Sequence, residues 1–135
     1  LLDMSMTLGL TLERSLEELT RLLTIPCLDL LLLTKNSEIR AYALMGKGYD
    51  MMGVIHEWGG KKPEDVLELV QAAGTQLDTD GIMLLAPGSL AQNWKDSFSK
   101  AAKSHEEVPM ALVKPLKSHL PPDFAELFVW GLDSI

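Results

Sequence analysis

The feature that most constrains this chain is a run of three apolar segments joined by very short connections. The segments span residues 28–33, 39–45 and 51–58. The connections contain Lys-Asn-Ser at residues 35–37 and Gly-Lys-Gly at residues 46–48, which are residue types that favour tight reversals of the chain. A parallel pair of strands would need a connection of about a dozen residues or more. We therefore predict three consecutive antiparallel strands.

After the third strand the apolar pattern changes from strand-like to helix-like. Pro63 followed by two acids fits the first turn of a helix, and apolar residues then recur at helical spacing through residues 63–73. Residues 82–86 are a short apolar strand, and the crossover that precedes it is long enough to make it parallel to the third strand. Ser89 is predicted to cap a further helix over residues 89–103.

The two ends of the chain complete the predicted domain. Thr11 is predicted to cap a helix over residues 11–23, while residues 1–10 are either a linker or a frayed strand. Residues 110–113 and 127–130 are predicted as two further strands. The whole chain is then one α/β (α+β) domain, with a mixed sheet made of an antiparallel meander and a β-α-β crossover, and with helices on both faces.

Length and composition fit a globular domain with a single hydrophobic core. The chain has 135 residues, of which 47% are hydrophobic and 23% are charged. The net charge of −7 argues against a nucleic-acid partner, because phosphate binding needs clustered Lys and Arg. The longest apolar run is far below the roughly 20 residues of a membrane helix, so no membrane partner is expected. Cys27 and the three His residues lack metal-ligand spacing, and the single cysteine and the absence of a secretory leader favour the cytoplasm.

The order of these elements resembles that of the GCN5-related N-acetyltransferase (GNAT) family. The resemblance lies in the strand at 51–58, the helix at 63–73, the strand at 82–86 and the helix at 89–103, and it covers residues 11–135. It is a resemblance of topology more than of motif. It implies an acetyltransferase fold, acetyl-CoA (acyl-CoA) as the cofactor, and a small-molecule or peptide amine as the acceptor of the acyl group.

In that family, the loop between the strand and the helix that follows it binds the coenzyme A pyrophosphate. The corresponding stretch here is residues 56–63, His-Glu-Trp-Gly-Gly-Lys-Lys-Pro, in which glycines permit close backbone approach and lysines supply positive charge. The resemblance implies that the cofactor-binding residues are Trp58, Gly59, Gly60, Lys61 and Lys62. The family pattern is Arg or Gln, two residues, Gly, one residue, and Gly or Ala, whereas the glycines here are adjacent. The alternative is a plain strand-to-helix turn with solvated lysines.

The resemblance also implies a base on or near this strand that removes a proton from the acceptor amine. Glu57 lies at that place, and His56 is an alternative because imidazole titrates near neutral pH. Adjacent strand residues point to opposite faces, so only one of the two can face the cleft expected between strands 51–58 and 82–86. The alternatives are an exposed acid at the strand end for Glu57 and a hydrogen-bonded core or edge histidine for His56.

The sequence leaves two functions of this fold open, besides an unrelated small-molecule sensor on a similar mixed sheet. The first is an acyl-CoA-dependent N-acyltransferase with an unidentified acceptor. The second is a catalytically degenerate domain of the same fold that serves dimerisation or packs against a second GNAT domain, and a first residue other than Met is compatible with one half of a longer or tandem protein. The family often protonates the leaving thiolate with a Tyr on the helix at 89–103. That helix carries Trp94 and Phe98 instead, which are four residues apart and are predicted to lie in the core.

Overall fold

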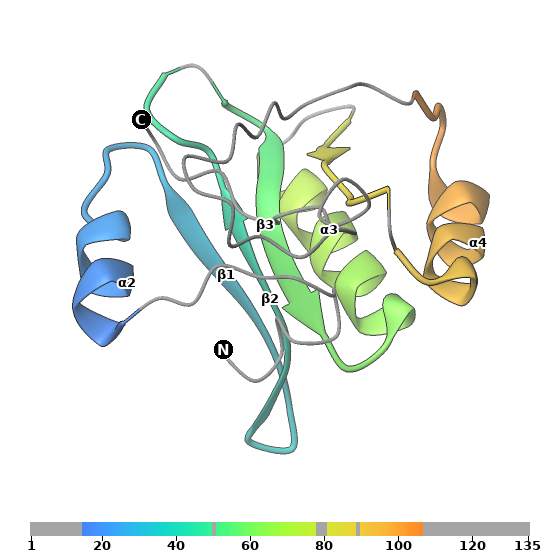
Figure 1. The fold of residues 1–135 in the computed structure, drawn as a ribbon, viewed down its shortest axis with the longest axis horizontal. Helices are drawn as coiled ribbons and strands as arrows, with labels where there is room; N and C mark the ends of the chain where they lie inside the picture. Colours follow the sequence, from blue (N-terminus) through green and yellow to red (C-terminus); the bar gives the residue numbers. More distant parts are fainter. Residues whose placement is uncertain (1–14, 50, 78–80, 89, 107–135) are drawn as a thin grey trace, which may run out of the picture.

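The computed structural model describes residues 15–49, 51–77, 81–88 and 90–106. The described elements follow one another as α2 (Leu16–Leu22), β1 (Asp29–Lys35), β2 (Glu38–Met45), β3 (Val54–Gly60), α3 (Pro63–Leu77), β4 (Met83–Leu84) and α4 (Gln92–Ala101) (Figure 1). The strands expected at 110–113 and 127–130 lie outside the described residues, as do the segment 1–10 and the expected cap Thr11.

The four strands form one sheet in the order β1-β2-β3-β4. β1 pairs antiparallel with β2, β2 pairs antiparallel with β3, and β3 pairs parallel with β4. The predicted meander and the parallel crossover through α3 are therefore confirmed. The described part of the chain is a mixed α+β domain, and it is compatible with the expected α/β class.

The reversal between β1 and β2 is a two-residue turn. Lys35 pairs with Glu38, and Asn36 and Ser37 between them have φ values of 53° and 63°. A hairpin loop of this length favours left-handed backbone at both central positions, and Asn tolerates it better than most residues. The short connection thus fixes the antiparallel pairing, as the sequence predicted.

The connection between β2 and β3 is longer than predicted, because β3 begins at Val54 and not at residue 51. Gly46 opens this connection with a φ of 77°, and its N–H donates to the Val54 carbonyl at 3.0 Å. A Cβ at Gly46 would overlap the carbonyl oxygen of Cys27. The glycine therefore permits both the left-handed backbone at residue 46 and the close approach of the Cys27 backbone, which precedes β1.

α2 begins later than the predicted helix at 11–23. Its N-cap is Ser15, whose hydroxyl accepts a hydrogen bond from the N–H of Glu18 at 3.2 Å. The Glu18 carboxylate in turn accepts from the N–H of Ser15 at 2.7 Å, which completes a capping box. The Ser-x-x-Glu spacing was present in the sequence, and it locates the first helical residue at Leu16.

The other elements also differ from prediction at their ends. α3 continues through Gly74 to Leu77, beyond the predicted end at residue 73, and β4 covers two residues rather than five. α4 begins at Gln92 after the N-cap Ala91, which makes no side-chain capping bond, so the predicted start after Ser89 is wrong. Helix boundaries without a side-chain cap leave little trace in a sequence.

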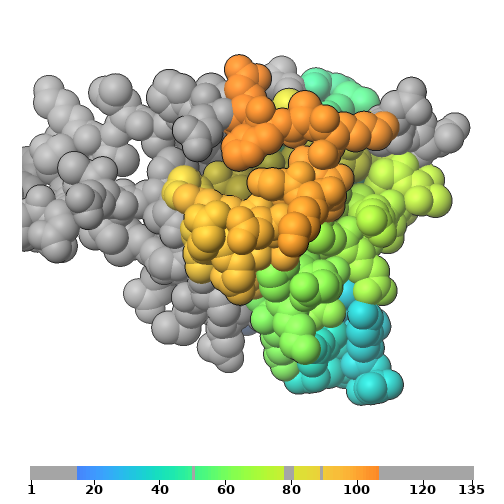
Figure 2. Space-filling view, turned by 90° about the vertical axis from the view of Figure 1, so that its right-hand side faces the viewer, coloured from blue at the N-terminus to red at the C-terminus, as the bar shows by residue number. Residues whose placement is uncertain are grey.

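One hydrophobic core lies between the sheet and α3, with α4 beside α3 on the same side (Figure 1). Figure 2 shows α4, in yellow to orange, lying against the green α3. The strands, the two helices and Leu90, which precedes α4, contribute ten buried side chains: Ala41, Ala43, Met45, Ile55, Trp58, Val66, Leu69, Ala73, Leu90 and Trp94. The core predicted for Trp94 is confirmed.

The second face of the sheet carries Tyr42 and Leu44, which are 4% and 1% exposed. Helices were expected on both faces, but α3 and α4 share one face, and α2, drawn to the left of β1 in Figure 1, has no buried residue. Among the described residues, no helix therefore covers the face of the sheet that carries Tyr42 and Leu44. No described helix combines the length and the apolar character needed to cross a membrane.

Candidate functional site

The stretch singled out by the sequence, residues 56–62, forms the end of β3 and the connection to α3. Gly59 and Gly60 lie inside β3, where they pair with Tyr42 and Ala41 of β2. The expectation that these two glycines lie in the connection between the strand and the helix is thus wrong, because both belong to the strand. The connection itself consists of Lys61 and Lys62, both exposed.

Gly60 has a packing role that explains the missing side chain. A Cβ at this position would lie 2.7 Å from Cγ2 of Val66 and 3.4 Å from the Cβ of Ala41. Val66 is fully buried in the first half of α3. The glycine therefore lets the helix approach the end of β3 closely, and its backbone φ is not in the left-handed region.

His56 is the extra residue of a β-bulge. Leu44 pairs with Glu57 and Met45 pairs with Ile55, so His56 has no partner position on β2. The side chain is 1% exposed, and its Nε2 lies 2.8 Å from the carbonyl oxygen of Gly46. A carbonyl oxygen only accepts, so Nε2 carries the proton of this bond. The placement matches the hydrogen-bonded core histidine that the sequence left open.

Glu57 is buried at 7% exposed, so it is not the exposed strand-end acid that the sequence offered as an alternative. It lies opposite Leu44 of β2, whereas the next residue, Trp58, lies opposite Ala43. Consecutive strand residues point to opposite faces of a sheet. Glu57 and Trp58 therefore cannot both contact one ligand from the same face, although both were expected in one site.

Trp58 is fully buried rather than open to a ligand. Its indole stacks on Trp94 with 5.6 Å between ring centroids and meets the edge of Phe98 at 5.2 Å. The indole Nε1 donates a hydrogen bond of 2.7 Å to the carbonyl oxygen of Leu85. The helical spacing of Trp94 and Phe98 predicted that both lie in the core. Nothing in the sequence indicated that the Trp58 ring would contact both of them.

β3 and β4 pair over only two residues each, and the Trp58 indole lies beyond this short pairing. Val54 pairs with Met83 and Ile55 with Leu84, and the N–H of Leu85 donates to the Ile55 carbonyl at 3.0 Å. β3 then continues to Gly60 while β4 ends at Leu84. Beyond this point, the hydrogen bond from the Trp58 indole takes over the link between the two segments. The expected cleft between the two strands is filled by aromatic side chains on this side.

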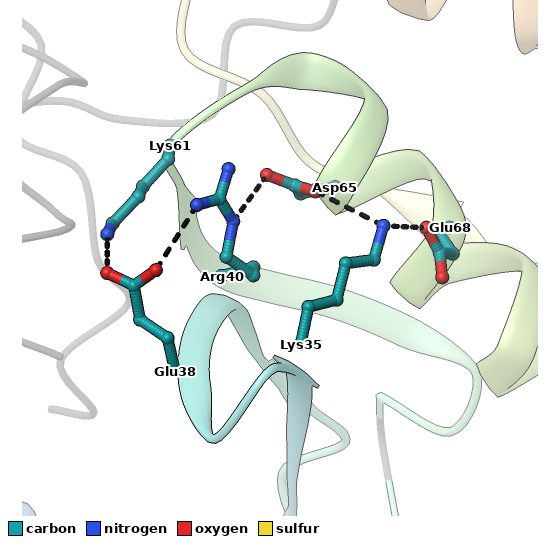
Figure 3. A network of polar contacts seen from close by, with 6 residues as sticks. All are labelled: Lys35, Glu38, Arg40, Lys61, Asp65 and Glu68. Atoms are coloured by element: carbon teal, nitrogen blue, oxygen red, sulfur yellow. Dashed lines mark hydrogen bonds and ion pairs between the residues drawn. The ribbon is translucent and has the colours of Figure 1, made fainter.

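A second feature, which the sequence did not predict, is a charged network at the start of α3 (Figure 3). It joins the β1–β2 hairpin to the β3–α3 connection through three basic and three acidic residues: Lys35, Glu38, Arg40, Lys61, Asp65 and Glu68. The formal charges of the six side chains cancel. No short sequence motif contains these residues, because they come from segments about thirty positions apart.

Asp65 is the buried member of this network, at 6% exposed. Its Oδ2 lies 3.5 Å from Nε of Arg40, and its Oδ1 lies 3.6 Å from Nζ of Lys35. The Lys35 ammonium also donates to the Glu68 carboxylate at 2.6 Å, and this hydrogen bond is the main reason that the pKa of Lys35 is raised. A buried carboxylate requires such compensation, because an unpaired charge away from water is costly.

Lys61 is held by an acid of β2 and does not extend freely from the loop. Its ammonium donates a hydrogen bond to the carboxylate of Glu38, and its backbone N–H donates to the carbonyl of Arg40 at 3.1 Å. The hydrogen bond from Lys61 is also the main reason that the pKa of Glu38 is lowered. The guanidinium of Arg40 contacts the same carboxylate at 3.3 Å. The positive charge expected to meet a phosphate is thus shared with a carboxylate.

Most of the residues that the resemblance implied for acetyl-CoA are engaged in contacts within the domain. Trp58 and Gly60 are used in internal packing, Lys61 is paired, and a buried carboxylate lies at the third position of α3. Lys61 and Lys62 both keep the exposed position that the resemblance implied, but the Lys61 ammonium is paired with Glu38. The described residues therefore do not fit a coenzyme A pyrophosphate at this place. They also contain no group of three His, Cys, Asp or Glu side chains suited to a metal ion.

Comparisons with known proteins add no family to this picture. No protein-family model, no curated protein and no solved structure matches the chain.

Proposed function

We propose that this chain is a non-catalytic domain of the acetyltransferase type of fold, which acts by packing against a second domain of that type. The observation that carries the proposal is the position of Trp58. Its indole is fully buried where β3 and β4 separate, and it is hydrogen-bonded to Leu85. An acyl-CoA arm between these two segments would have to displace it.

The cost of that displacement is large compared with ordinary ligand affinity. Removing a buried Trp side chain from a core costs about 3–5 kcal/mol. A ligand with a micromolar dissociation constant has a binding free energy of about −8 kcal/mol. Expelling Trp58 would therefore consume roughly half of such an affinity before any contact with the cofactor was made.

The packing role is supported by apolar side chains at the end of the sheet where β3 and β4 begin. Tyr49, Met52 and Met83 are 84%, 74% and 60% exposed. Gly53, which follows Met52, accepts a hydrogen bond of 3.0 Å from the N–H of Met83, so the loop and β4 are adjacent. Exposed Met and Tyr side chains grouped in this way favour a protein contact. The proposed partner is a second domain of the same fold, as a second copy or in the same protein.

A second candidate is the acyl-CoA-dependent N-acyltransferase that the family resemblance implies, and the parallel pairing of β3 and β4 favours it. In this proposal acetyl-CoA is the cofactor, Glu57 is the base and a small-molecule or peptide amine is the acceptor. His56 is the weaker choice, because its Nε2 is engaged with Gly46. The exposed free thiol of Cys27 fits a reducing compartment, so in both proposals the protein acts in the cytoplasm.

Calorimetric titration with acetyl-CoA separates the two candidates. The first predicts no heat of binding and no change in melting temperature. Saturable binding, abolished by an excess of coenzyme A, would favour the second and contradict the first. Steady-state acyl transfer to a panel of amines, with Glu57→Gln as the matched variant, would then test the role of Glu57.

Sedimentation tests the packing role. The wild-type domain and a variant with Tyr49, Met52 and Met83 all changed to Ser are compared over a range of concentrations. Self-association that is lost in the variant would support packing through this end of the sheet. A wild-type domain that stays monomeric at high concentration would exclude a second copy as the partner and would leave only a linked domain.

A further inference from the structure

One of the two acids in the first turn of α3 is buried. Asp65 is the third residue of α3, and it is buried while its neighbour Glu64 is exposed. The first N–H groups of a helix have no partner within the helix, and they attract anions together with the helix dipole. Pro63 supplies no N–H, so one of these donors is already absent.

Both sides of the Asp65 carboxylate are covered by cations of the β1–β2 hairpin. Arg40 reaches Oδ2 at 3.5 Å and Lys35 reaches Oδ1 at 3.6 Å. Figure 3 shows the two basic side chains extending from the strands toward the first turn of the helix, with Asp65 between them. Two cations beside a helix N-terminus are also expected around a bound anion, but here the Asp65 carboxylate occupies the position of the anion.

We infer that Asp65 acts as an internal anion that closes the N-terminus of α3 to phosphate, so that the pyrophosphate of an acyl-CoA is excluded there. The inference deepens the proposed non-catalytic function and rests on it. A pyrophosphate group at this helix end would lie close to the buried negative charge of Asp65 in the first turn. It would also have to compete with Glu38 for Lys61 and Arg40.

The test measures binding of inorganic pyrophosphate by calorimetry at low ionic strength. The wild-type domain is compared with Asp65→Asn, which keeps the shape of the side chain and removes its charge. Glu64→Gln is the matched control, since it removes one negative charge from the same helix turn at an exposed position outside the network. We expect no saturable binding by the wild type or the control. Asp65→Asn should bind saturably, at least about tenfold more tightly than the upper limit set by the wild-type titration, because Arg40 and Lys35 each lose one of their two carboxylate partners.

Two results would overturn the inference. One is saturable pyrophosphate binding by the wild type that coenzyme A displaces. The other is a folded Asp65→Asn variant, as judged by circular dichroism, that binds pyrophosphate no better than Glu64→Gln does. If Asp65→Asn does not fold, the wild-type titration still decides, and Glu38→Gln provides a second variant that releases Lys61 and Arg40 at an exposed position. A smaller gain is expected for Glu38→Gln, because Asp65 remains in place.

Acetyl-pantetheine, which lacks the nucleotide and the pyrophosphate, separates this inference from the proposed function. Binding of acetyl-pantetheine by the wild type would show that Trp58 yields its place, and would contradict the proposed function alone. Binding of pyrophosphate without acetyl-pantetheine would contradict the role of Asp65 and leave the argument from Trp58 standing. One probe reports on Trp58 in β3 and the other on Asp65 in α3, so the two failures give different results.

Discussion

Replacing Gly60 by Ala tests the close approach of α3 to the sheet. The added Cβ would lie 2.7 Å from Cγ2 of Val66, whereas unstrained carbon pairs lie at roughly 3.5–4.0 Å. Val66 is fully buried and β-branched, so it has little freedom to rotate away. Overpacking of this kind costs about 1–3 kcal/mol. The loss of chain entropy in the unfolded state returns about 0.4–1 kcal/mol. We expect the free energy of unfolding to fall by about 1–2 kcal/mol as the sum of these two effects.

The assay is urea unfolding followed by tryptophan fluorescence, because Trp58 and Trp94 lie in the core beside the substituted position. Gly74→Ala, near the C-terminal end of α3, is the matched control, since its Cβ would make an ordinary contact of 3.6 Å with Ile82. A helix interior favours Ala over Gly by about 1 kcal/mol, so the control should gain stability. A Gly60→Ala variant as stable as the wild type would refute the reasoning. So would strict additivity with Val66→Ala, because removing the clashing methyl groups should relieve part of the loss.

Three further predictions concern the candidate site and its surroundings. Trp58→Phe loses the hydrogen bond to Leu85 and leaves a cavity, and it should lower the free energy of unfolding by about 2–4 kcal/mol; a loss below about 1 kcal/mol in urea unfolding would speak against the indole as the link between β3 and β4. Gly46→Ala combines a φ of 77° with overlap at the Cys27 carbonyl and should cost more than about 2 kcal/mol, while Gly81→Ala, which has open space, should change little. The lowered pKa of Glu38 contributes stability that is present at neutral pH and is lost as the pH falls below its ordinary value of 4.5, so Glu38→Gln should flatten this part of the pH dependence of the melting temperature.

The sheet could be predicted because its connections are local. Asn36 and Ser37 permit only a tight reversal, and the crossover through α3 is long enough for a parallel strand, so pairing follows from connection length. The β-bulge at His56 could not be predicted. It depends on how Met45 meets Ile55 across the sheet, and no residue type near it is specific for a bulge.

The candidate site was predicted less well, because its residues have partners that are distant in sequence. Gly60 was interpreted as part of a phosphate loop, but the contact that requires a glycine comes from Val66 of the packed helix. Lys61 was interpreted as a phosphate ligand, but its partner Glu38 lies more than twenty positions earlier. Residue type alone cannot distinguish a glycine that admits a ligand from one that admits a helix.

The side chains of residues 56–61 make several hydrogen bonds within the domain, and these bonds affect whether the segment could form a site. His56 Nε2 is bonded to Gly46, the Trp58 indole to Leu85 and the Lys61 ammonium to Glu38, so these three polar groups have partners inside the domain. A catalytic site needs groups that are held rigidly and still face the substrate. In the proposed non-catalytic function, these contacts meet the first condition and not the second, because the rigidity comes from the same atoms that a ligand would use. If the proposed function and the inference about Asp65 hold, opening one contact would not create a cofactor site, since the indole and the carboxylate of Asp65 would block different parts of the same ligand.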